Sequence, residues 1–266
     1  MDHLLEFINV KKIFHRSKLG NMLSKTERTE SDFCAVDSVS FSVDKGEFVG
    51  LVGRTGCGKS TLARIAARLL FPDSGSVYYK GKKVHSLNNE ELRDFRSRVR
   101  MLFQDPSASL NPHMSVFHII EEPIKLYTSL SKKDRQEKVK ELLEEMNLFF
   151  CEKKNPFELS GGEKRRVSLA RGLAMNPELI IADEVTSNLD SSIKQQVMNI
   201  LSRRNRENNM AILLISHDLR LVRQWCQHIE VMENGRIVET LMTEKATKDN
   251  AHHPFTKELL DAILEI

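Results

Sequence analysis

A segment in the first quarter of the chain has the residues of a phosphate-binding loop. Positions 53–60 read Gly-Arg-Thr-Gly-Cys-Gly-Lys-Ser and match the pattern G-x-x-x-x-G-K-[ST] without a gap. Glycines at these positions let successive backbone N–H groups point inward, and a helix that begins near Ser60 adds its positive end. The alternative interpretation is a glycine-rich turn that simply precedes a helix.

The last two residues of the pattern carry the chemistry. Lys59 would place a cation between the β- and γ-phosphates of ATP, and the Ser60 hydroxyl would be a ligand of Mg²⁺. The predicted nucleotide-binding residues of this segment are Gly53, Arg54, Thr55, Gly56, Cys57, Gly58, Lys59, Ser60 and Thr61.

Two acidic residues follow an apolar run farther along the chain. Leu179–Ala182 reads as a buried strand, and Asp183 and Glu184 come directly after it. In open α/β sheets, ligands bind at the carboxyl ends of strands. Asp183 would hold Mg²⁺ through water, and Glu184 would polarise the attacking water as general base. Without the phosphate loop, the same pattern could be a strand that simply leaves the core.

Segments with the apolar pattern of strands alternate along the sequence with segments that have the periodicity of helices. Predicted strands are Leu5–Val10, Val36–Val43, Glu47–Val52, Val77–Tyr79, Val99–Phe103, Leu179–Ala182, Ala211–Ile215, His228–Glu233 and Arg236–Thr240. Predicted helices are Ser60–Leu70, Gly162–Met175, Ser191–Arg204, Leu219–Cys226 and Pro254–Ile266. Strands that alternate with helices predict a largely parallel sheet covered on both faces.

Two segments depart from this alternation. From Ser115 to Phe150 the periodicity is helical, so the block Ser115–Met175 is predicted to be a helical subdomain inserted into the sheet. Its charge-rich stretch Ser131–Glu145 is interpreted as a solvated helix face. The polar stretch from His15 to Asp32 is predicted to be an exposed loop or hairpin excursion.

The composition is that of an ordinary globular protein, with 266 residues, 40% hydrophobic and 29% charged, and a net charge of +3. This charge is weak evidence for nucleic acid binding. The four cysteines form no CxxC pair, which indicates reduced thiols in a cytosolic protein. No stretch reaches the roughly 18 apolar residues of a membrane helix, and the start MDHLLEFINV argues against a signal peptide. Any role at a membrane would therefore be carried out from the cytosol through a partner.

The segment Leu159–Arg166, Leu-Ser-Gly-Gly-Glu-Lys-Arg-Arg, closely resembles the LSGGQ signature of ABC ATPases. The phosphate loop, this signature, the acidic strand end and His217 follow in the order and at the spacing of that family. The resemblance covers essentially the whole chain. It implies an α/β fold: an ABC-type nucleotide-binding domain with a phosphate-loop parallel sheet core, an N-terminal antiparallel β subdomain and an inserted helical subdomain. The expected boundaries are one domain over residues 1–266, with the helical subdomain at about 115–175 and a C-terminal tail at about 243–266.

Further roles follow from the resemblance, residue by residue. Gln104 resembles the glutamine that touches Mg²⁺ or water and senses the membrane partner, and His217 resembles the switch histidine at the γ-phosphate. Phe14 resembles the aromatic residue that stacks on adenine. Ser187–Asp190 resembles the D-loop, and its Asp190 is expected among the nucleotide-binding residues. The implied catalytic residues are Glu184, His217, Lys59 and Gln104, and the implied metal ligands are Ser60, Gln104 and Asp183.

In this family the signature forms an anion nest that faces the γ-phosphate held by the opposite subunit. Ser160, Gly161 and Gly162 therefore imply that activity needs a dimer, in which ATP joins the two halves. Glu163 stands where Gln is usual, and its negative charge is expected to lie near a phosphate site and to slow the cycle slightly.

The segments Phe103–Pro106, Ser109–Pro112 and His253–Leu260 resemble the peptide/nickel importer group. Asn188 favours the nickel or metal-chelate branch, whereas the long loop after Phe14 favours the oligopeptide/dipeptide branch, and the expectation leans to nickel.

The implied partners are two transmembrane permease subunits, an extracytoplasmic substrate-binding protein, and a second ATPase subunit, either a different chain in a heterodimer or a second copy of this one. The implied location is the cytoplasmic face of the membrane, with no nucleic acid bound. The alternatives are a soluble ABC ATPase that acts on ribosomes or DNA, and a binding module without turnover.

Overall fold

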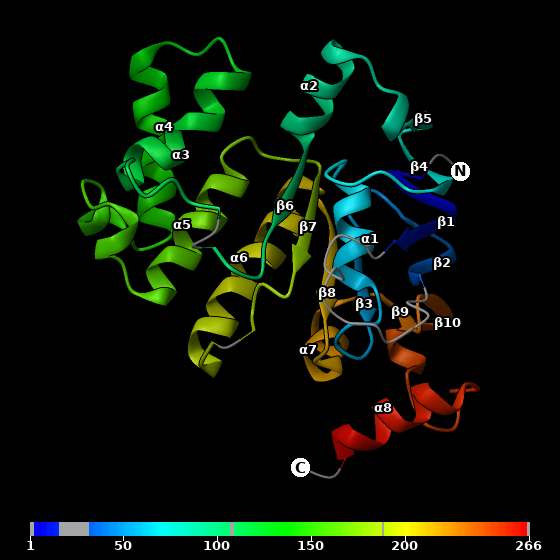
Figure 1. The fold of residues 1–266 in the computed structure, drawn as a ribbon. Helices are drawn as coiled ribbons and strands as arrows, with labels where there is room; N and C mark the ends of the chain where they lie inside the picture. Colours follow the sequence, from blue (N-terminus) through cyan, green and yellow to red (C-terminus); the bar gives the residue numbers. More distant parts are fainter. Residues whose placement is uncertain (1–2, 16–31, 107–108, 188, 265–266) are drawn as a thin grey trace, which may run out of the picture.

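The computed structural model describes residues 3–15, 32–106, 109–187 and 189–264 (Figure 1). The predicted polar excursion between His15 and Asp32 lies outside these ranges. In the described part of the chain the strands form two sheets, ordered β2-β1-β4-β5 and β10-β9-β3-β8-β7-β6. The strands are β1 Leu5–Phe14, β2 Phe33–Val43, β3 Phe48–Val52, β4 Ser74–Tyr79, β5 Lys82–Lys83, β6 Val99–Leu102, β7 Leu179–Asp183, β8 Ala211–Ser216, β9 His228–Glu233 and β10 Arg236–Met242.

The helices are α1 Lys59–Ala66, α2 Asn89–Arg98, α3 Val116–Tyr127, α4 Lys132–Glu145, α5 Gly161–Leu173, α6 Ser191–Asn208, α7 Leu219–Trp225 and α8 Pro254–Leu264. Short 3₁₀ turns lie at Val84–Ser86, Phe149–Cys151, Pro156–Glu158 and Thr243–Lys245. None of the described helices is both long and apolar enough to cross a membrane.

The larger sheet is parallel except for its edge strand β10. Every residue of β3, β7 and β8 is buried, as expected for parallel strands covered on both faces. In the register, Val52 pairs with Ser216, Asp183 with Ile215, and Leu102 with Ala182. The carboxyl ends of β3, β6, β7 and β8 therefore meet at one edge of the sheet.

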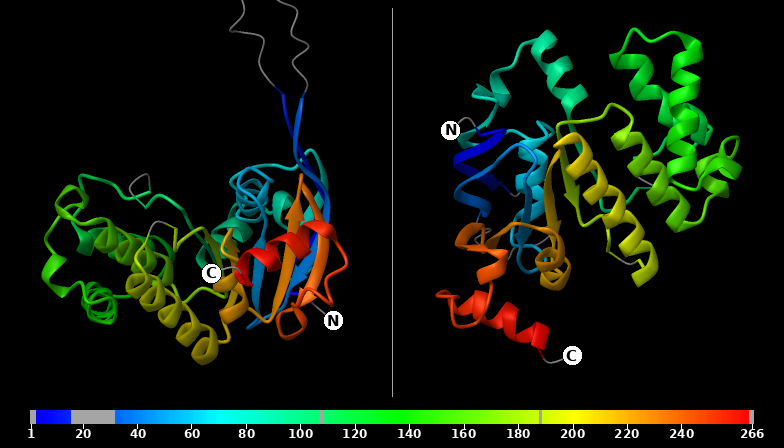
Figure 2. Two further views of the ribbon diagram at one scale, coloured as in Figure 1. Left: turned by 90° about the horizontal axis from the view of Figure 1, so that it is seen from below. Right: turned by 180° about the vertical axis from the view of Figure 1, so that it is seen from behind.

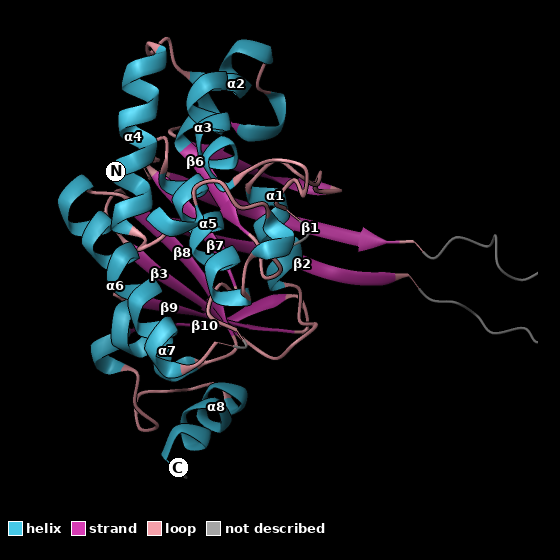
Figure 3. Cartoon of the chain, turned by 90° about the vertical axis from the view of Figure 1, so that its left-hand side faces the viewer, coloured by secondary structure: helices cyan, strands magenta, loops and turns pink. Residues whose placement is uncertain are grey.

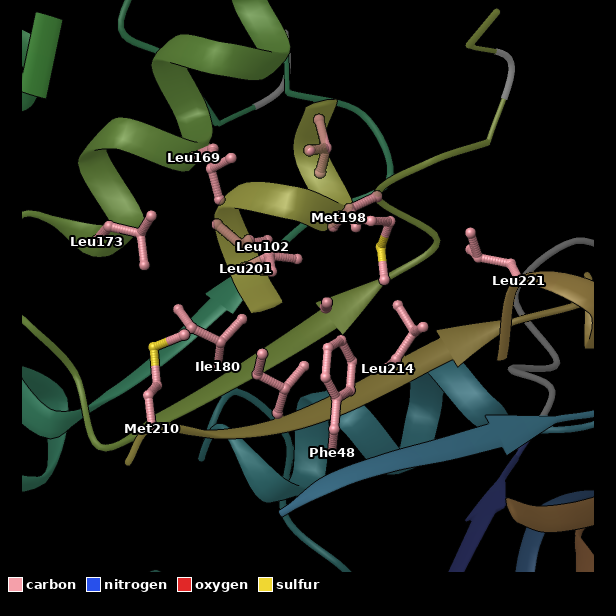
Figure 4. Close-up of a cluster of buried hydrophobic side chains, with 14 of the residues drawn as sticks. Phe48, Leu102, Leu169, Leu173, Ile180, Met198, Leu201, Met210, Leu214 and Leu221 are labelled. Carbon is pink, nitrogen blue, oxygen red and sulfur yellow. The ribbon is translucent and has the colours of Figure 1, made fainter. Parts of the chain in front are cut away.

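Two hydrophobic cores cover the two faces of this sheet, and alternate residues of one strand supply them. Leu179 and Ile181 face α1 and the antiparallel sheet, in a core that includes Phe7 and Leu62. Figure 4 shows the other core, where Ile180 packs with side chains of α5 and α6. The predicted α/β architecture, with a parallel core and an N-terminal antiparallel sheet, is confirmed.

The chain between β6 and β7 forms a helical block of α3, α4 and α5, which stands to one side of the sheets (Figure 2). The helical run expected from Ser115 to Phe150 is interrupted between Tyr127 and Lys132, because Ser131 caps α4 by accepting a hydrogen bond from Asp134. On the opposite side, β1 and β2 run side by side and project from the body of the molecule (Figure 3).

Helices α1 and α2 also differ from the sequence-based expectation. Helix α1 ends at Ala66 and not at Leu70, because the backbone turns left-handed at Arg68, with φ 55°. Helix α2 was not expected at all. Its sequence signal is a capping box, in which Asn88 and Glu91 bond each other's backbone N–H groups.

Candidate active site

The phosphate loop connects buried strand β3 to α1, as its motif requires. Gly58 caps α1 with φ 111°, a conformation that favours glycine. A Cβ atom there would lie 2.0 Å from the carbonyl oxygen of Ala35, so any other residue would displace the loop or β2. The loop is therefore held against β2 by a contact that only glycine permits.

The ammonium group of Lys59 lies inside this loop. The residue is only 4% exposed, and Nζ donates to the carbonyl oxygens of Gly53 at 2.7 Å and Arg54 at 2.9 Å. No carboxylate of the described residues lies within ion-pair distance of Nζ. A buried cation held only by neutral groups is costly unless an anion compensates it. The loop is thus built to receive a negatively charged group such as a phosphate.

Ser60 and Asp183 meet beside the loop. Ser60 Oγ donates to Asp183 Oδ1 at 2.9 Å, and Asp183 is 4% exposed. Burial raises the pKa of Asp183, the hydrogen bond from Ser60 opposes this shift, and the nearby Glu184 charge adds to it. A hydroxyl beside a buried carboxylate suits Mg²⁺, which takes one or two protein oxygens together with substrate phosphates. The described residues contain no cluster of three or more His, Cys, Asp or Glu side chains that could hold a metal alone.

Glu184 lies at the centre of a hydrogen-bonding network at the same edge. Gln104 Nε2 donates to Glu184 Oε2 at 3.2 Å and Ser187 Oγ donates at 2.9 Å, while His217 Nδ1 lies 3.3 Å from Oε1. The backbone of Glu184 is left-handed, with φ 47°, and such strained positions cluster at functional sites. The network fixes the direction of a carboxylate that could accept a proton from water.

A cleft of about 460 Å³ joins these groups. It is lined by Phe33 and Ala35 of β2, by six phosphate-loop and α1 residues, and by Gln104, Glu184, Ser187 and His217. The structure therefore brings together the predicted phosphate loop, glutamine, acidic pair and histidine. Ser187 is a network member that was predicted only as part of the D-loop, with no role of its own.

Phe14, the aromatic residue expected to stack on adenine, does not line the cleft. Phe14 pairs with Phe33 across β1 and β2, and both rings are exposed, by 41% and 55%. Of the two, Phe33 lines the cleft. Sequence reasoning missed Phe33, because only the strand register places it opposite Phe14.

The Arg54 side chain makes its contacts outside the cleft. Its guanidinium pairs with Glu258 of α8 and lies 5.2 Å from the centroid of the Phe255 ring. Arg54 is not among the residues that line the cleft, so its side chain links the phosphate loop to the C-terminal helix.

The signature segment starts α5. Ser160 is the N-cap, and Glu163 Oε2 accepts a hydrogen bond from the Ser160 backbone at 2.7 Å, which completes a capping box. Glu163 Oε1 accepts from Cys151 Sγ at 3.2 Å. The backbone hydrogen bond from Ser160 is the main cause of the lowered pKa of Glu163. The Glu163 carboxylate therefore points back to the N-terminus of α5, its own helix. Ser160, Gly161 and Gly162 do not line the cleft of their own chain.

Asp190 occupies a similar position at the start of α6. Its carboxylate accepts from the Ile193 backbone at 2.9 Å and from Ser192 Oγ at 2.7 Å. Asp190 is a helix cap and does not line the described cleft. Asn188, used above to discriminate between branches, lies outside the described residues.

Comparison with known proteins adds an independent observation. The sequence profile of the ABC transporter family matches residues 36–187. The oligopeptide transport ATP-binding protein AppF of Bacillus subtilis is 43% identical over 98% of this chain and 78% of that protein. The nickel import ATP-binding protein NikE of Brucella suis is 37% identical over 98% of this chain and 95% of that protein. Among solved structures, the dimeric post-hydrolysis state of the ATP-binding cassette MJ0796 bound to ADP and Pi has a TM-score of 0.79 and 28% identity, covering 90% of this chain and 98% of that one.

Proposed function

The chain belongs to the ABC transporter family, and on this premise we propose that it is the ATP-hydrolysing subunit of an importer that drives uptake through a membrane permease. As a member of this family it is an ATPase whose hydrolysis is coupled to transport. The observation that carries the site assignment is the buried Lys59 ammonium, which lacks a carboxylate partner among the described residues and faces a cleft with Ser60, Glu184 and His217.

The phosphates of ATP are proposed to bind at the backbone N–H groups of the loop and at Lys59. Ser60 and Asp183 would hold Mg²⁺, which when bound supplies charge neutralisation for the β- and γ-phosphate oxygens. Phe33 lines the cleft and is proposed to contact the base, with its strand neighbour Phe14 as the alternative.

Glu184 is proposed to act as the general base for hydrolysis. Gln104 and Ser187 donate to one of its oxygens, which leaves the other beside His217 and open to a water molecule. His217 is 55% exposed in its side chain and lines the cleft, a position from which it would contact the γ-phosphate. Hydrolysis thus depends on side chains from the ends of β6, β7 and β8.

A second ATPase subunit is proposed to complete each site. Ser160, Gly161 and Gly162 start a helix away from their own cleft. The Ser160 N–H donates to Glu163, so the N–H groups of Gly161 and Gly162 are those proposed to receive a phosphate held by a partner. The partner is either a different ATPase chain or a second copy of this one. Two permease subunits and an extracytoplasmic substrate-binding protein complete the proposed assembly, in which this chain lies at the cytoplasmic face of the membrane.

The proposed cargo is either oligopeptides or nickel, because relatives named for both align along nearly the whole chain. The identity of 43% to the oligopeptide relative exceeds the 37% to the nickel relative, which makes peptides the first cargo to test.

Uptake in cells that lack this chain tests the proposal. Labelled nickel and a labelled short peptide are supplied in parallel, and the gene is restored as wild type or as Lys59→Ala. Loss of uptake of one cargo, restored by wild type and not by Lys59→Ala, supports the function and identifies the cargo. Normal uptake of both would contradict the importer assignment for these cargo classes.

A further inference from the structure

Arg165 connects the two chain segments that supply hydrogen bonds to Glu184. It lies on α5 and is half-buried. Its Nη2 atom donates to the carbonyl oxygen of Gln104 at 2.7 Å. Its Nη1 atom donates to the carbonyl oxygen of Ser187 at 3.2 Å, and also to that of Val185. A single guanidinium therefore holds the chain that follows β6 and the chain that follows β7.

The three carbonyl oxygens lie where the chain leaves the parallel sheet. The paired parts of β6 and β7 end before Gln104, Val185 and Ser187. In the described part of the chain, no backbone N–H group donates to any of these three oxygens. Val185 is buried, and a buried carbonyl group that lacks a donor is costly. Arg165 supplies the donors that the sheet does not.

Gln104 and Ser187 also bond Glu184 through their side chains. Gln104 Nε2 and Ser187 Oγ both donate to Glu184 Oε2, at 3.2 and 2.9 Å. The Ser187 N–H donates to the Glu184 carbonyl oxygen at 3.0 Å, which closes the turn between them. Each of the two donor residues thus contacts Arg165 through its main chain and Glu184 through its side chain. A shift of either main chain would move a donor away from the carboxylate.

The chemistry of arginine suits this position. A guanidinium is charged at any pH near neutrality and presents its N–H donors in a rigid planar fork, whereas a lysine ammonium is a single point on a flexible stem. Burial lowers the pKa of Arg165, and the charge of Asp105 opposes this shift. Arg165 does not line the nucleotide cleft, so its contacts reach the site through other residues.

We propose that Arg165 is a positioning residue for ATP hydrolysis, which holds the main chains of Gln104 and Ser187 so that their side chains stay directed at Glu184. This inference rests on the proposed function and adds to its site a residue outside the cleft. The hydrogen bonds of Arg165 go to the strand ends and not to the phosphate loop. Loss of the guanidinium should therefore slow hydrolysis and leave the affinity for ATP unchanged.

Single-turnover hydrolysis and ATP binding by the full chain test the proposal. We expect Arg165→Gln to lower the hydrolysis rate by about 10- to 100-fold, with the Kd for ATP within about 2-fold of wild type. Arg165→Lys keeps the charge but not the fork, and it should show a smaller loss. Arg206→Gln makes the same change at an exposed position of α6 and should be as active as wild type. An unchanged rate in Arg165→Gln, or a weakened affinity at an unchanged rate, would overturn the proposal.

A double-variant cycle separates positioning from a general loosening of the fold. If Arg165 acts through Glu184, adding Arg165→Gln to Glu184→Gln should lower the slow residual rate by less than about 2-fold. The same fold-loss in both backgrounds would show that Arg165 acts independently of Glu184, and would contradict the proposed role.

Amide hydrogen exchange gives a readout that needs no turnover. The Ser187 amide should exchange about 10-fold faster in Arg165→Gln, because its turn is no longer held, and at the wild-type rate in Arg206→Gln. Unchanged exchange at Ser187 would overturn the inference and leave the proposed function intact.

Two further outcomes are decided by controls. Circular dichroism melting establishes that each variant is folded. If Arg165→Gln does not fold, Arg165→Lys decides through the same measurements, and wild-type hydrolysis by that variant would overturn the proposal. If wild-type protein hydrolyses no ATP, the proposed function fails, and this inference fails with it.

Discussion

Ser60 Oγ donates a hydrogen bond to Asp183 Oδ1 at 2.9 Å, although the two residues are 123 positions apart in the sequence. The contact exists because β3 and β7 both pair with β8 in parallel, which brings their carboxyl ends to the same edge. The hydroxyl that opens α1 and the carboxylate that ends β7 are thus positioned by the sheet before any ligand binds.

Asp183→Asn should abolish the Mg²⁺ dependence of the site. The amide keeps the volume and can still bond Ser60, but it removes the buried negative charge that a divalent cation requires. We expect ATP hydrolysis to fall by at least about 100-fold, with nucleotide binding in the absence of Mg²⁺ unchanged. Titration of ATPase activity with Mg²⁺ measures this effect. Asp94→Asn, at an exposed carboxylate of α2, is the matched control, and full activity of Asp183→Asn would exclude the assigned role.

Glu163→Gln should have little effect on activity. The Glu163 carboxylate bonds the Ser160 backbone of its own helix, and glutamine serves equally in a capping box. We expect ATPase rates within about 3-fold of wild type, whereas Glu163→Ala should lower the free energy of unfolding by about 1 kcal/mol. Steady-state kinetics and urea denaturation measure the two effects. A large rate increase in Glu163→Gln would mean that the charge acts on the phosphate site after all.

Glu258→Gln should loosen the phosphate loop. Glu258 pairs with Arg54, and both side chains are 62% exposed, so the pair contributes little to global stability. Loss of the Arg54–Glu258 pair is expected to change the position of the phosphate loop. The KM for ATP should therefore rise about 2- to 5-fold, with kcat unchanged. Arg54→Gln should give the same change, and the double variant should add nothing further. Additive effects in this cycle would show that the two residues act independently.

His228 should make the stability of the fold depend on pH. Burial disfavours the charged ring, but hydrogen bonds and the charges of Glu230 and Glu47 outweigh it and raise the pKa of His228 to about 9. The folded-state pKa lies above the unfolded value of about 6.5, so the stabilisation is complete below pH 6.5 and is lost as the pH rises through 9.

Urea unfolding at pH 6, 7.5 and 9.5 measures this dependence. The free energy of unfolding of the wild type should fall by about 1–3 kcal/mol over that range, relative to the change in His228→Asn. His113→Asn, at an exposed histidine, should follow the wild-type profile. Parallel pH profiles for wild type and His228→Asn would contradict the assignment.

The parts of the site that could be predicted from sequence are those at strand ends. Gln104, Glu184 and His217 each come after an apolar run, and parallel strands bring such positions to one edge whatever the details of packing. The helical block was predictable for a similar reason, since its periodicity persists over several turns. Family resemblance supplied the roles of Gln104 and His217, whereas the role of Glu184 was predicted from the acidic strand end together with the phosphate loop.

Other features depend on tertiary context that no local pattern encodes. The irregular register of β1 and β2 places Phe33, not Phe14, in the cleft lining. The loop motif does not indicate where the Arg54 side chain lies, and only the position of α8 shows that its guanidinium pairs with Glu258.

Glu184 is proposed to be the general base for ATP hydrolysis, whereas the phosphate loop and Lys59 are proposed to bind the nucleotide. The measurement that tests it most directly is single-turnover ATP hydrolysis by Glu184→Gln, with ATP affinity and sedimentation behaviour recorded on the same sample. We predict ATP affinity close to that of wild type, a hydrolysis rate lower by at least about 100-fold, and a stable ATP-bound dimer. Hydrolysis by Glu184→Gln at the wild-type rate would contradict it.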